Sequence, residues 1–347
     1  MLPANLGGTA TRLLIVGGHP RSGTTFAQLL VSSFPEAATV NETHVLSQIV
    51  GPSLRSFDGF SERARTGRRN VGPNVVFQRG EFLRYYQRMV DDLRDRVLKR
   101  KPGASIAIEK TPENLLYWRE LTSLRLGMAF LEVVRDPRDV FASLKAARRD
   151  WANDWSGIGA QNFAQRWCTF VRQGNALRDH PVRSHRLRYE ALLGPNAPQA
   201  LSTALQALGL DRGPAECRAA LERLSISRMK SGVVDLPWDL GREPDGFFRN
   251  GRAGGWTEEL TDPEIKAIEA VAGPTMISVG YELSGRKAVE PARAREPAHP
   301  DRPADSGRSG QARPAGQVQA GKPGSQNQMK RPARPGRPDR PGKPRTP

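Results

Sequence analysis

The residues best suited to chemistry lie near the start of the chain, where a short apolar run meets a glycine-rich turn. Residues 13–16, "LLIV", predict a buried strand, and "GGHPRSGTT" then leads into an amphipathic helix that begins near Thr24. Glycines let the backbone direct several N–H groups at one anion. The first turn of a helix also favours phosphate, because its N–H groups lack partners and its dipole is positive there. With Arg21 as a fixed positive charge, the stretch predicts a phosphate-binding loop.

The loop departs from that of nucleotide kinases at one position. The kinase pattern is G-x-x-x-x-G-K-[ST]. Here Gly18 and Gly23 keep the spacing, but Thr24 occupies the position of the lysine. The sequence also shows no acidic pair placed to hold a magnesium ion. A P-loop nucleotide-dependent kinase is therefore the alternative interpretation, and a glycine turn without a ligand is the other.

The stretch "PRSGTTF" resembles the 5′-phosphosulfate loop of sulfotransferases that use PAPS (3′-phosphoadenosine 5′-phosphosulfate). Those loops read P-[KR]-[SA]-G-[TS]-[TS], so the basic residue lies inside the loop, at Arg21 here. The resemblance implies a three-layer α/β/α fold with a central parallel sheet, like that of P-loop NTPases. It also implies that PAPS is bound by Arg21, Ser22, Gly23, Thr24, Thr25 and Phe26.

A second segment resembles the part of these enzymes that binds the 3′-phosphate. In "FLEVVRDPRDVFASL" (130–144), a strand is followed by R-[DN]-P-[RK]-D and then by a helix that bears a serine. The resemblance implies that Arg135 and Ser143 hold the phosphate. Arginine suits this role because it makes bidentate, permanently charged phosphate contacts. The alternative is a surface arginine beside ion pairs on the helix.

A third segment resembles the loop that closes over the 3′-phosphate and the adenine. "FFRNGRAGGWTEELT" is similar to F-R-K-G-x-x-G-D-W: Arg249 and Gly251 match, whereas Asn250 replaces the lysine. Arg252 is a candidate to supply the missing charge. By the same resemblance Tyr189, in "LRYEALLG", packs near the adenine, with a core tyrosine as the alternative.

The catalytic base is expected in "TVNETHVL" (39–46), which offers Glu42 and His44. A base must lie within hydrogen-bond reach of the acceptor proton that it removes. By resemblance, cytosolic sulfotransferases use a histidine here, and tyrosylprotein sulfotransferases use a glutamate in a pattern like E-E-T-R-[VI]-[IV]. We favour Glu42 over His44, and Glu109 is a further candidate.

A lysine is expected to stabilise the leaving group. In "AIEKTPENLLYW" (107–118) a strand ends at Glu109, and Lys110 lies at the turn that follows. The family's corresponding lysine contacts the bridging oxygen, where charge builds and a fixed cation lowers the barrier. Ser225, in "LSISRMK", is implied to touch the leaving group as well. The resemblance thus implies in-line transfer of a sulfuryl group from PAPS to a hydroxyl or amine, with PAP as product and no metal.

The elements that must position these residues alternate between strands and helices. Strand-like runs at residues 12–18, 105–109, 128–134 and 185–190 are each followed by helical patterns. This alternation predicts a parallel sheet with helices on both faces. Ligands of such sheets bind beyond the carboxyl ends of the strands, where three of the motifs fall.

The charge of the chain is concentrated in its last part. The 347 residues carry a formal net charge of +17, of which residues 286–347 contribute +10, together with 12 of the 28 prolines. This stretch has almost no large apolar side chains and cannot form a core. We therefore expect a sulfotransferase domain at 1–285 and a disordered basic tail at 286–347. A binding protein is a further alternative, but the tail lacks aromatic residues, so any nucleic-acid binding would be nonspecific.

The sequence predicts a cytoplasmic protein. No apolar run is long enough to span a membrane, and the first residues lack the pattern of a signal peptide. Cys168 and Cys217 are isolated, and the five histidines show no metal-ligand spacing. We expect residues 46–80 to shape the acceptor pocket and to form a mobile lid. A small molecule, a carbohydrate and a peptide all stay open as acceptors, and the oligomeric state stays open too.

Overall fold

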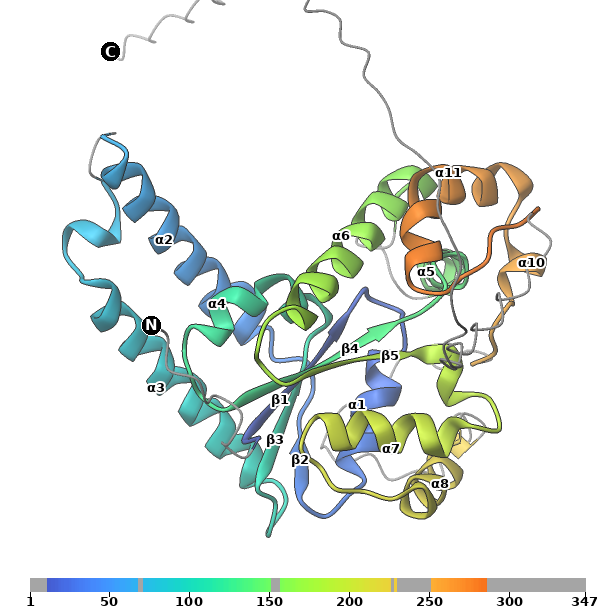
Figure 1. Cartoon of the computed structure of the whole chain (residues 1–347), viewed down its shortest axis with the longest axis horizontal. Coiled ribbons are helices and arrows are strands. Elements are labelled where there is room, and N and C mark those ends of the chain that lie inside the picture. Colours follow the sequence, from blue (N-terminus) through green and yellow to red (C-terminus); the bar gives the residue numbers. More distant parts are fainter. Residues whose placement is uncertain (1–10, 68–70, 151–156, 226–227, 230–250, 286–347) are drawn as a thin grey trace, which may run out of the picture. The chain divides into compact units, whose positions relative to one another are not determined.

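The computed structural model describes residues 11–67, 71–150, 157–225, 228–229 and 251–285 of the chain. At its centre lies a five-stranded sheet with the order β2-β3-β1-β4-β5, in which every neighbouring pair is parallel (Figure 1). The predicted α/β fold with a central parallel sheet is confirmed. The strands are β1 (Leu13–Gly18), β2 (Ala37–Thr39), β3 (Ile106–Lys110), β4 (Met128–Val134) and β5 (Ser184–Arg188).

Helices cover both faces of this sheet. The α-helices are α1 (Thr24–Ser32), α2 (Gly51–Arg65), α3 (Arg79–Leu98), α4 (Trp118–Thr122), α5 (Pro137–Asp150), α6 (Ala160–Arg178), α7 (Ala197–Ala207), α8 (Pro214–Arg223), α10 (Trp256–Glu259) and α11 (Asp262–Ser278). Shorter turns of other helix types are η1 (Val45–Val50), η2 (Pro73–Val75), η3 (Pro112–Tyr117) and η4 (Tyr189–Leu192). None of the α-helices in these ranges combines the length and the apolar character needed to cross a membrane.

The side chains of β1 alternate between two cores, one on each face of the sheet. Leu14 and Val16 pack with α1, α7 and α8, whereas Leu13 and Ile15 pack with α3, α4 and α6. Because both faces are covered, β1, β3 and β4 are buried along their whole length. The arrangement is the expected three-layer α/β/α fold.

The strand order places a topological switch at β1. The chain builds β2 and β3 on one side of β1 and then crosses to build β4 and β5 on the other. The helices that leave β1 and β4 also separate: α1 packs with α7, and α5 packs with α6 and α11. In such folds ligands bind in a crevice at the carboxyl ends of these strands.

Residues 46–80, expected to form a mobile lid, begin with helical structure. Most of their first half is helical, as η1 and then α2, and Val50, Leu54 and Phe57 are buried. Spacings of four and three residues define a helical stripe. Gly59 and the surrounding serines and arginines obscure this stripe in the sequence. This part is therefore a packed helix, and its role as a mobile lid of the acceptor pocket stays a prediction.

Candidate active site at the carboxyl edge of the sheet

The predicted phosphate loop connects β1 to α1 and requires its glycines. Gly18 and Gly23 have φ angles of 152° and 92°, which side chains rarely tolerate. A Cβ atom on Gly23 would overlap the ring of Tyr189. Ser22, which lies between the two glycines, is fully buried, and its hydroxyl has no hydrogen-bond partner among the described residues. An unpaired buried donor beside the first turn of a helix suits an anionic ligand.

Arg21 joins the loop to the predicted 3′-phosphate segment. Its φ of 71° is unusual for a residue with a side chain, and its Nε donates a hydrogen bond of 3.2 Å to Oγ of Ser143 on α5. Thr24 and Thr25 begin α1, and Phe26 packs edge-on against Tyr189, with 6.3 Å between ring centroids. The six predicted loop residues therefore lie beside the second predicted segment.

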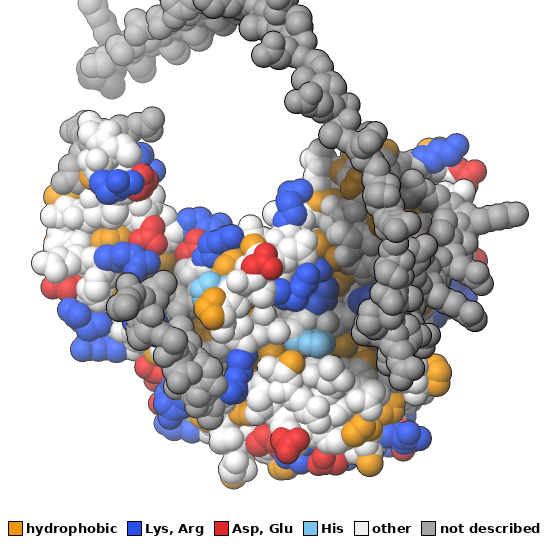
Figure 2. Space-filling view, viewed as in Figure 1, with side chains coloured by type: hydrophobic (Ala, Val, Ile, Leu, Met, Phe, Trp, Pro, Cys, Tyr) orange, Lys and Arg blue, Asp and Glu red, His pale blue; other side chains and the backbone are white. Residues whose placement is uncertain are grey.

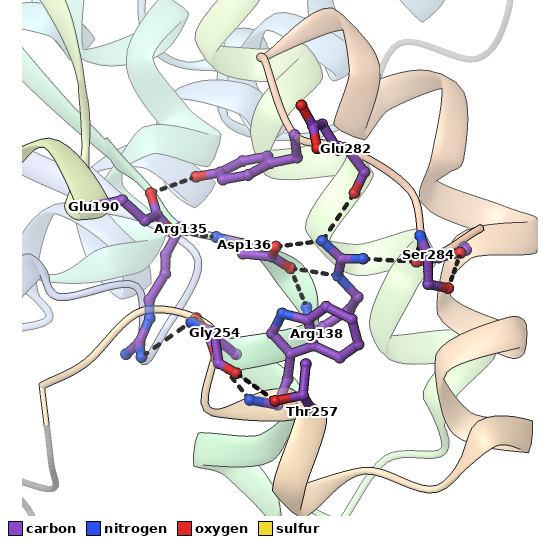
Figure 3. Close-up of polar contacts among 12 residues, drawn as sticks. Arg135, Asp136, Arg138, Glu190, Gly254, Thr257, Glu282 and Ser284 are labelled. Atoms are coloured by element: carbon purple, nitrogen blue, oxygen red, sulfur yellow. Dashed lines mark hydrogen bonds and ion pairs between the residues drawn. The ribbon is translucent and has the colours of Figure 1, made fainter. Parts of the chain in front are cut away.

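Arg135 and Tyr189 bring two further segments to the same place. The guanidinium carbon of Arg135 lies 4.5 Å from the centre of the Tyr189 ring. The Tyr189 hydroxyl donates to the carbonyl of Gly251 (3.1 Å), and Arg135 Nη2 donates to the carbonyl of Arg252 (3.0 Å; Figure 3). The Nε of Arg135 is buried without a hydrogen-bond partner. Four segments that are distant in the sequence thus converge on one buried cationic site.

Asp139 fastens the closing loop to this site. Its carboxylate accepts hydrogen bonds from the backbone N–H groups of Gly254 (2.8 Å) and Trp256 (3.0 Å). Burial raises the pKa of the Asp139 carboxyl, and these two bonds and the charge of Arg135 oppose the rise. The loop is therefore held from α5, directly beside Arg135.

Arg138 anchors the C-terminal helices to the same segment. Its guanidinium pairs with Asp136 (2.7 Å) and with Glu269 of α11 (2.7 Å), and it lies 4.0 Å from the ring centre of Trp256 (Figure 3). The sequence predicted ion pairs here only as the alternative to a phosphate site. The structure contains these ion pairs at Arg138, whereas Arg135 has other partners, and its role in a phosphate site stays a prediction.

His19, in the middle of the loop, is buried as a neutral ring. Burial among apolar groups lowers its pKa to about 3, and the nearby charge of Arg166 acts in the same direction. Its Nδ1 lies 2.8 Å from the carbonyl oxygen of Pro20, so Nδ1 carries the proton and donates it. The ring packs edge-on against Phe163 and Phe170 of α6. His19 therefore anchors the loop to the apolar side chains of α6.

Glu42, His44 and Lys110 form a cluster on the β2–β3 side of the crevice. Lys110, the last residue of β3, donates a hydrogen bond to Oε1 of Glu42, and Nε2 of His44 lies 3.6 Å from Oε2 of Glu42. The side chain of Lys110 is 5% exposed, whereas those of Glu42 and His44 are 35% and 45% exposed. These two candidate bases can thus be reached from solvent, whereas the lysine is almost fully buried.

Glu109, the third candidate base, lies beneath this cluster with no exposed surface. Its carboxylate accepts hydrogen bonds from Thr43, Thr111 and Asn114. Burial raises the pKa of this carboxyl, and the hydrogen bonds oppose the rise. An acceptor molecule cannot reach the group as it is packed here.

For three of the predicted site residues the structure does not bear on the predicted role. Arg249 and Asn250 lie outside the described residues. Ser225 lies in the turn after α8, where its carbonyl accepts a hydrogen bond from the N–H of Met229 (3.0 Å). Its contact with a leaving group stays a prediction. Within the described part of the chain, no group of three or more His, Cys, Asp and Glu side chains is placed to hold a metal ion.

The supporting roles of Asp139 and Glu109 could not be predicted from the sequence. Both residues belong to motifs quoted above, but their partners at residues 254–256 and at Thr43 are distant in the sequence. The one sequence signal for these supporting roles is a carboxylate inside an otherwise apolar or basic motif. Such a carboxylate must find donors when it is buried.

Comparisons with known proteins agree with this geometry. A model of the Sulfotransferase family matches residues 14–212, more than half of the chain. Among solved structures, the sulfotransferase domain of the olefin synthase from Synechococcus PCC 7002 is 17% identical, with a TM-score of 0.52 over 81% of this chain and 98% of that domain. Mouse sulfotransferase SULT7A1 complexed with PAP is 16% identical, with a TM-score of 0.50 over 77% of this chain and 85% of that chain. A search of curated protein sequences found no match. At these identities the two structures support the fold.

Proposed function

The chain belongs to the sulfotransferase family, and we propose that it transfers a sulfuryl group from PAPS to a hydroxyl or amine of an acceptor and releases PAP. One observation carries the proposal. The glycine loop, Arg135, Ser143 and Tyr189 come from separate parts of the chain and lie against one another at the switch point of the sheet. A nucleotide that is anionic at two positions requires this combination of two phosphate subsites and one aromatic ring.

The residues present fit such a donor. The Ser22 hydroxyl and the Nε of Arg135 are buried polar groups without hydrogen-bond partners in the described structure, and an anion would satisfy both. PAPS supplies an activated sulfuryl group on its 5′-phosphate and a second phosphate at the 3′ position. In this proposal the loop residues 21–26 hold the first end, and Arg135 and Ser143 hold the second. Arg249 and Asn250, by resemblance, add to the second.

Glu42 is the proposed base. Its carboxylate is accessible, and it lies on the strand-end cluster with Lys110, where the acceptor would meet the donor. Glu42 would take the acceptor's proton as the new bond forms, a step that typically contributes 10²–10⁴ in rate. Lys110 would then face the oxygen on which charge develops, and His44 would neighbour the base.

The acceptor would enter from the α2 side of the crevice. The space-filling view shows a hollow between α2 and α6, with basic side chains along its walls (Figure 2). Glu42 lies shortly before η1 and α2 in the chain, and we therefore expect the acceptor to reach it from this side. The acceptor class stays as broad as the sequence allows: a small molecule, a carbohydrate or a peptide.

Calorimetry with PAP tests the donor, with ATP as the competing ligand. We expect micromolar binding of PAP, no comparable binding of ATP, and loss of PAP binding in Arg135→Ala. Arg96→Ala is the matched control, because Arg96 lies on the exposed face of α3 and pairs only with Asp92 among the described contacts. Turnover of labelled PAPS with a panel of acceptors follows. Tight ATP binding without PAP binding would instead support the kinase.

A further inference from the structure

We propose that Glu109 is a positioning residue, which fixes the segment that carries Glu42 against the strand end that carries Lys110. The proposal rests on the proposed function for its catalytic consequence. It also changes the status of Glu109, which was a candidate base. Its evidence is a hydrogen-bond network that connects the two sides of the catalytic cluster through one buried carboxylate.

The carboxylate of Glu109 contacts all three segments around the cluster. Oε1 accepts hydrogen bonds from the backbone N–H of Thr43 (3.3 Å), from the Thr43 hydroxyl (2.7 Å) and from the Thr111 hydroxyl (2.8 Å). Oε2 accepts one from Nδ2 of Asn114 in η3. Thr43 lies between Glu42 and His44, and Thr111 directly follows Lys110. One side chain therefore joins the neighbours of the proposed base to those of the proposed cation.

The negative charge of Glu109 also decides which way the two hydroxyls point. An ionised carboxylate only accepts hydrogen bonds, so both threonine hydroxyls must donate to it. Their oxygens are then free to accept from the backbone. The Thr111 oxygen accepts from the N–H of His44 (3.3 Å), and the Thr43 oxygen accepts from the N–H of Val45 (3.3 Å). The carboxylate therefore holds residues 43–45 in two ways. It binds Thr43 directly, and it orients the two threonine hydroxyls that bind the N–H groups of His44 and Val45.

This order matters because the segment is strained. His44 has a φ of 54°, in the left-handed region that costs free energy for a residue with a side chain. Such a conformation persists only where the surroundings enforce it. The Glu109 network supplies that enforcement at the residue next to Thr43. Without it we expect residues 42–45 to relax, and Glu42 to lose its place beside Lys110.

The test compares Glu109→Gln with wild type in the full chain. Glutamine keeps the size of the side chain but turns one acceptor into a donor, which opposes the hydroxyl and amide donors around it. We expect kcat with PAPS to fall by about 10–100-fold, because small misplacements of reacting groups have effects of that size. PAP affinity should stay within about twofold of wild type, since no hydrogen bond in the described part of the chain joins the loop 21–26, Arg135, Ser143 or Tyr189 to this network. Amide hydrogen exchange at His44 and Val45 should accelerate.

Two further variants keep the test decisive. Thr111→Val removes one hydroxyl of the network and should reproduce the faster exchange at His44, even if Glu109→Gln folds poorly. Thr122→Val is its matched control, because that hydroxyl donates only within α4 (to the carbonyl of Arg119, 2.9 Å) among the described contacts. Unchanged exchange at His44 and Val45 in both network variants would overturn the proposal. A wild-type chain that neither binds PAP nor turns over PAPS would overturn the proposed function instead. The exchange data would still test whether Glu109 holds residues 43–45.

Discussion

The candidate site has two halves that are built differently. The donor half comprises the loop 18–26, Arg135, Ser143, Tyr189 and residues 251–256. The acceptor half comprises Glu42, His44, Lys110 and the Glu109 network. Ser143 and Tyr189 are 5% and 4% exposed, whereas the side chains of Glu42 and His44 are 35% and 45% exposed.

The contrast reflects what each half must recognise. In the proposed function the donor half binds a ligand of fixed chemistry. Its contacts join residues that are more than a hundred positions apart, such as Arg21 with Ser143 and Asp139 with Gly254. The acceptor half keeps its two outer candidate bases, Glu42 and His44, exposed, whereas Lys110 is buried, and one buried carboxylate, that of Glu109, supports the segment. Substitutions in the donor half should therefore change affinity for PAP, and those in the acceptor half should change kcat.

The largest effect is expected in the acceptor half, from Glu42→Gln. The amide cannot accept the acceptor's proton, so kcat should fall by about 10²–10⁴-fold. PAP affinity should stay near that of wild type, which separates chemistry from donor binding. Steady-state turnover of PAPS and PAP calorimetry measure the two quantities. Glu62→Gln, an equal change on the exposed face of α2, is the control. Unchanged turnover in Glu42→Gln would move the role of base to His44.

In the donor half, Gly23→Ala should weaken PAP binding by about 10–100-fold. At a φ of 92° a Cβ atom costs about 1–2 kcal/mol, and it also overlaps the Tyr189 ring. Gly59→Ala is the counterpart in α2, where the nearest atom to a new Cβ is the flexible Arg63 guanidinium at 3.4 Å. That change should leave PAP binding as it is and slightly stabilise the helix. Equal PAP affinity in both variants would mean that the loop does not hold the donor in this conformation.

The acid sensitivity of the donor half should depend on His19. Its pKa is lowered from 6.5 to about 3 by burial, so protonation favours the unfolded chain. Above pH 6.5 the ring is neutral in both the folded and the unfolded chain, so His19 does not lower the free energy of unfolding. As the pH falls from 6.5 towards 3, the unfolded chain binds a proton that the folded chain does not, and the free energy of unfolding decreases. By pH 5 the loss should reach about 2 kcal/mol relative to pH 7. Urea unfolding at both pH values measures it.

His19→Asn isolates this effect. Asparagine can keep a donor towards the carbonyl of Pro20 but has no group that titrates in this range. The difference in unfolding free energy between pH 7 and pH 5 should therefore be about 2 kcal/mol smaller in the variant than in wild type. Identical pH dependence in the two proteins would show that His19 is not held neutral in the folded chain.

The two halves also differ in how far the sequence could predict them. The donor motifs carry local signals, a strand followed by glycines or by Arg-Asp-Pro, and the strand predicted at 128–134 matches β4. Parallel strands then bring such motifs to one edge without further information. The acceptor half depends instead on contacts between residues distant in the sequence, such as Thr43 with Glu109, and no local sequence pattern predicts these contacts. The packed helix α2 was missed for a related reason, because burial of Leu54 and Phe57 outweighs its weak helix propensity.

The smallest effect is expected from Asp139→Asn, which loosens the closing loop without removing a ligand contact. Asparagine can accept only one of the two hydrogen bonds from Gly254 and Trp256, and it removes the negative charge 3.9 Å from Arg135. Loss of one such bond is worth about 1 kcal/mol, so PAP affinity should fall by about three- to tenfold.

Asp58→Asn makes the same chemical change at an exposed pair on α2 and should have no effect on PAP binding. If it weakened binding as much as Asp139→Asn, residues 254–256 would not belong to the donor half. The informative comparison is with Glu109→Gln, because each variant alters a buried carboxylate that holds a loop. Asp139→Asn should change PAP affinity, and Glu109→Gln should change kcat with affinity kept. A positioning carboxylate thus transmits its effect only to the half that it supports, and a shift of both quantities in both variants would mean that the halves act as one unit.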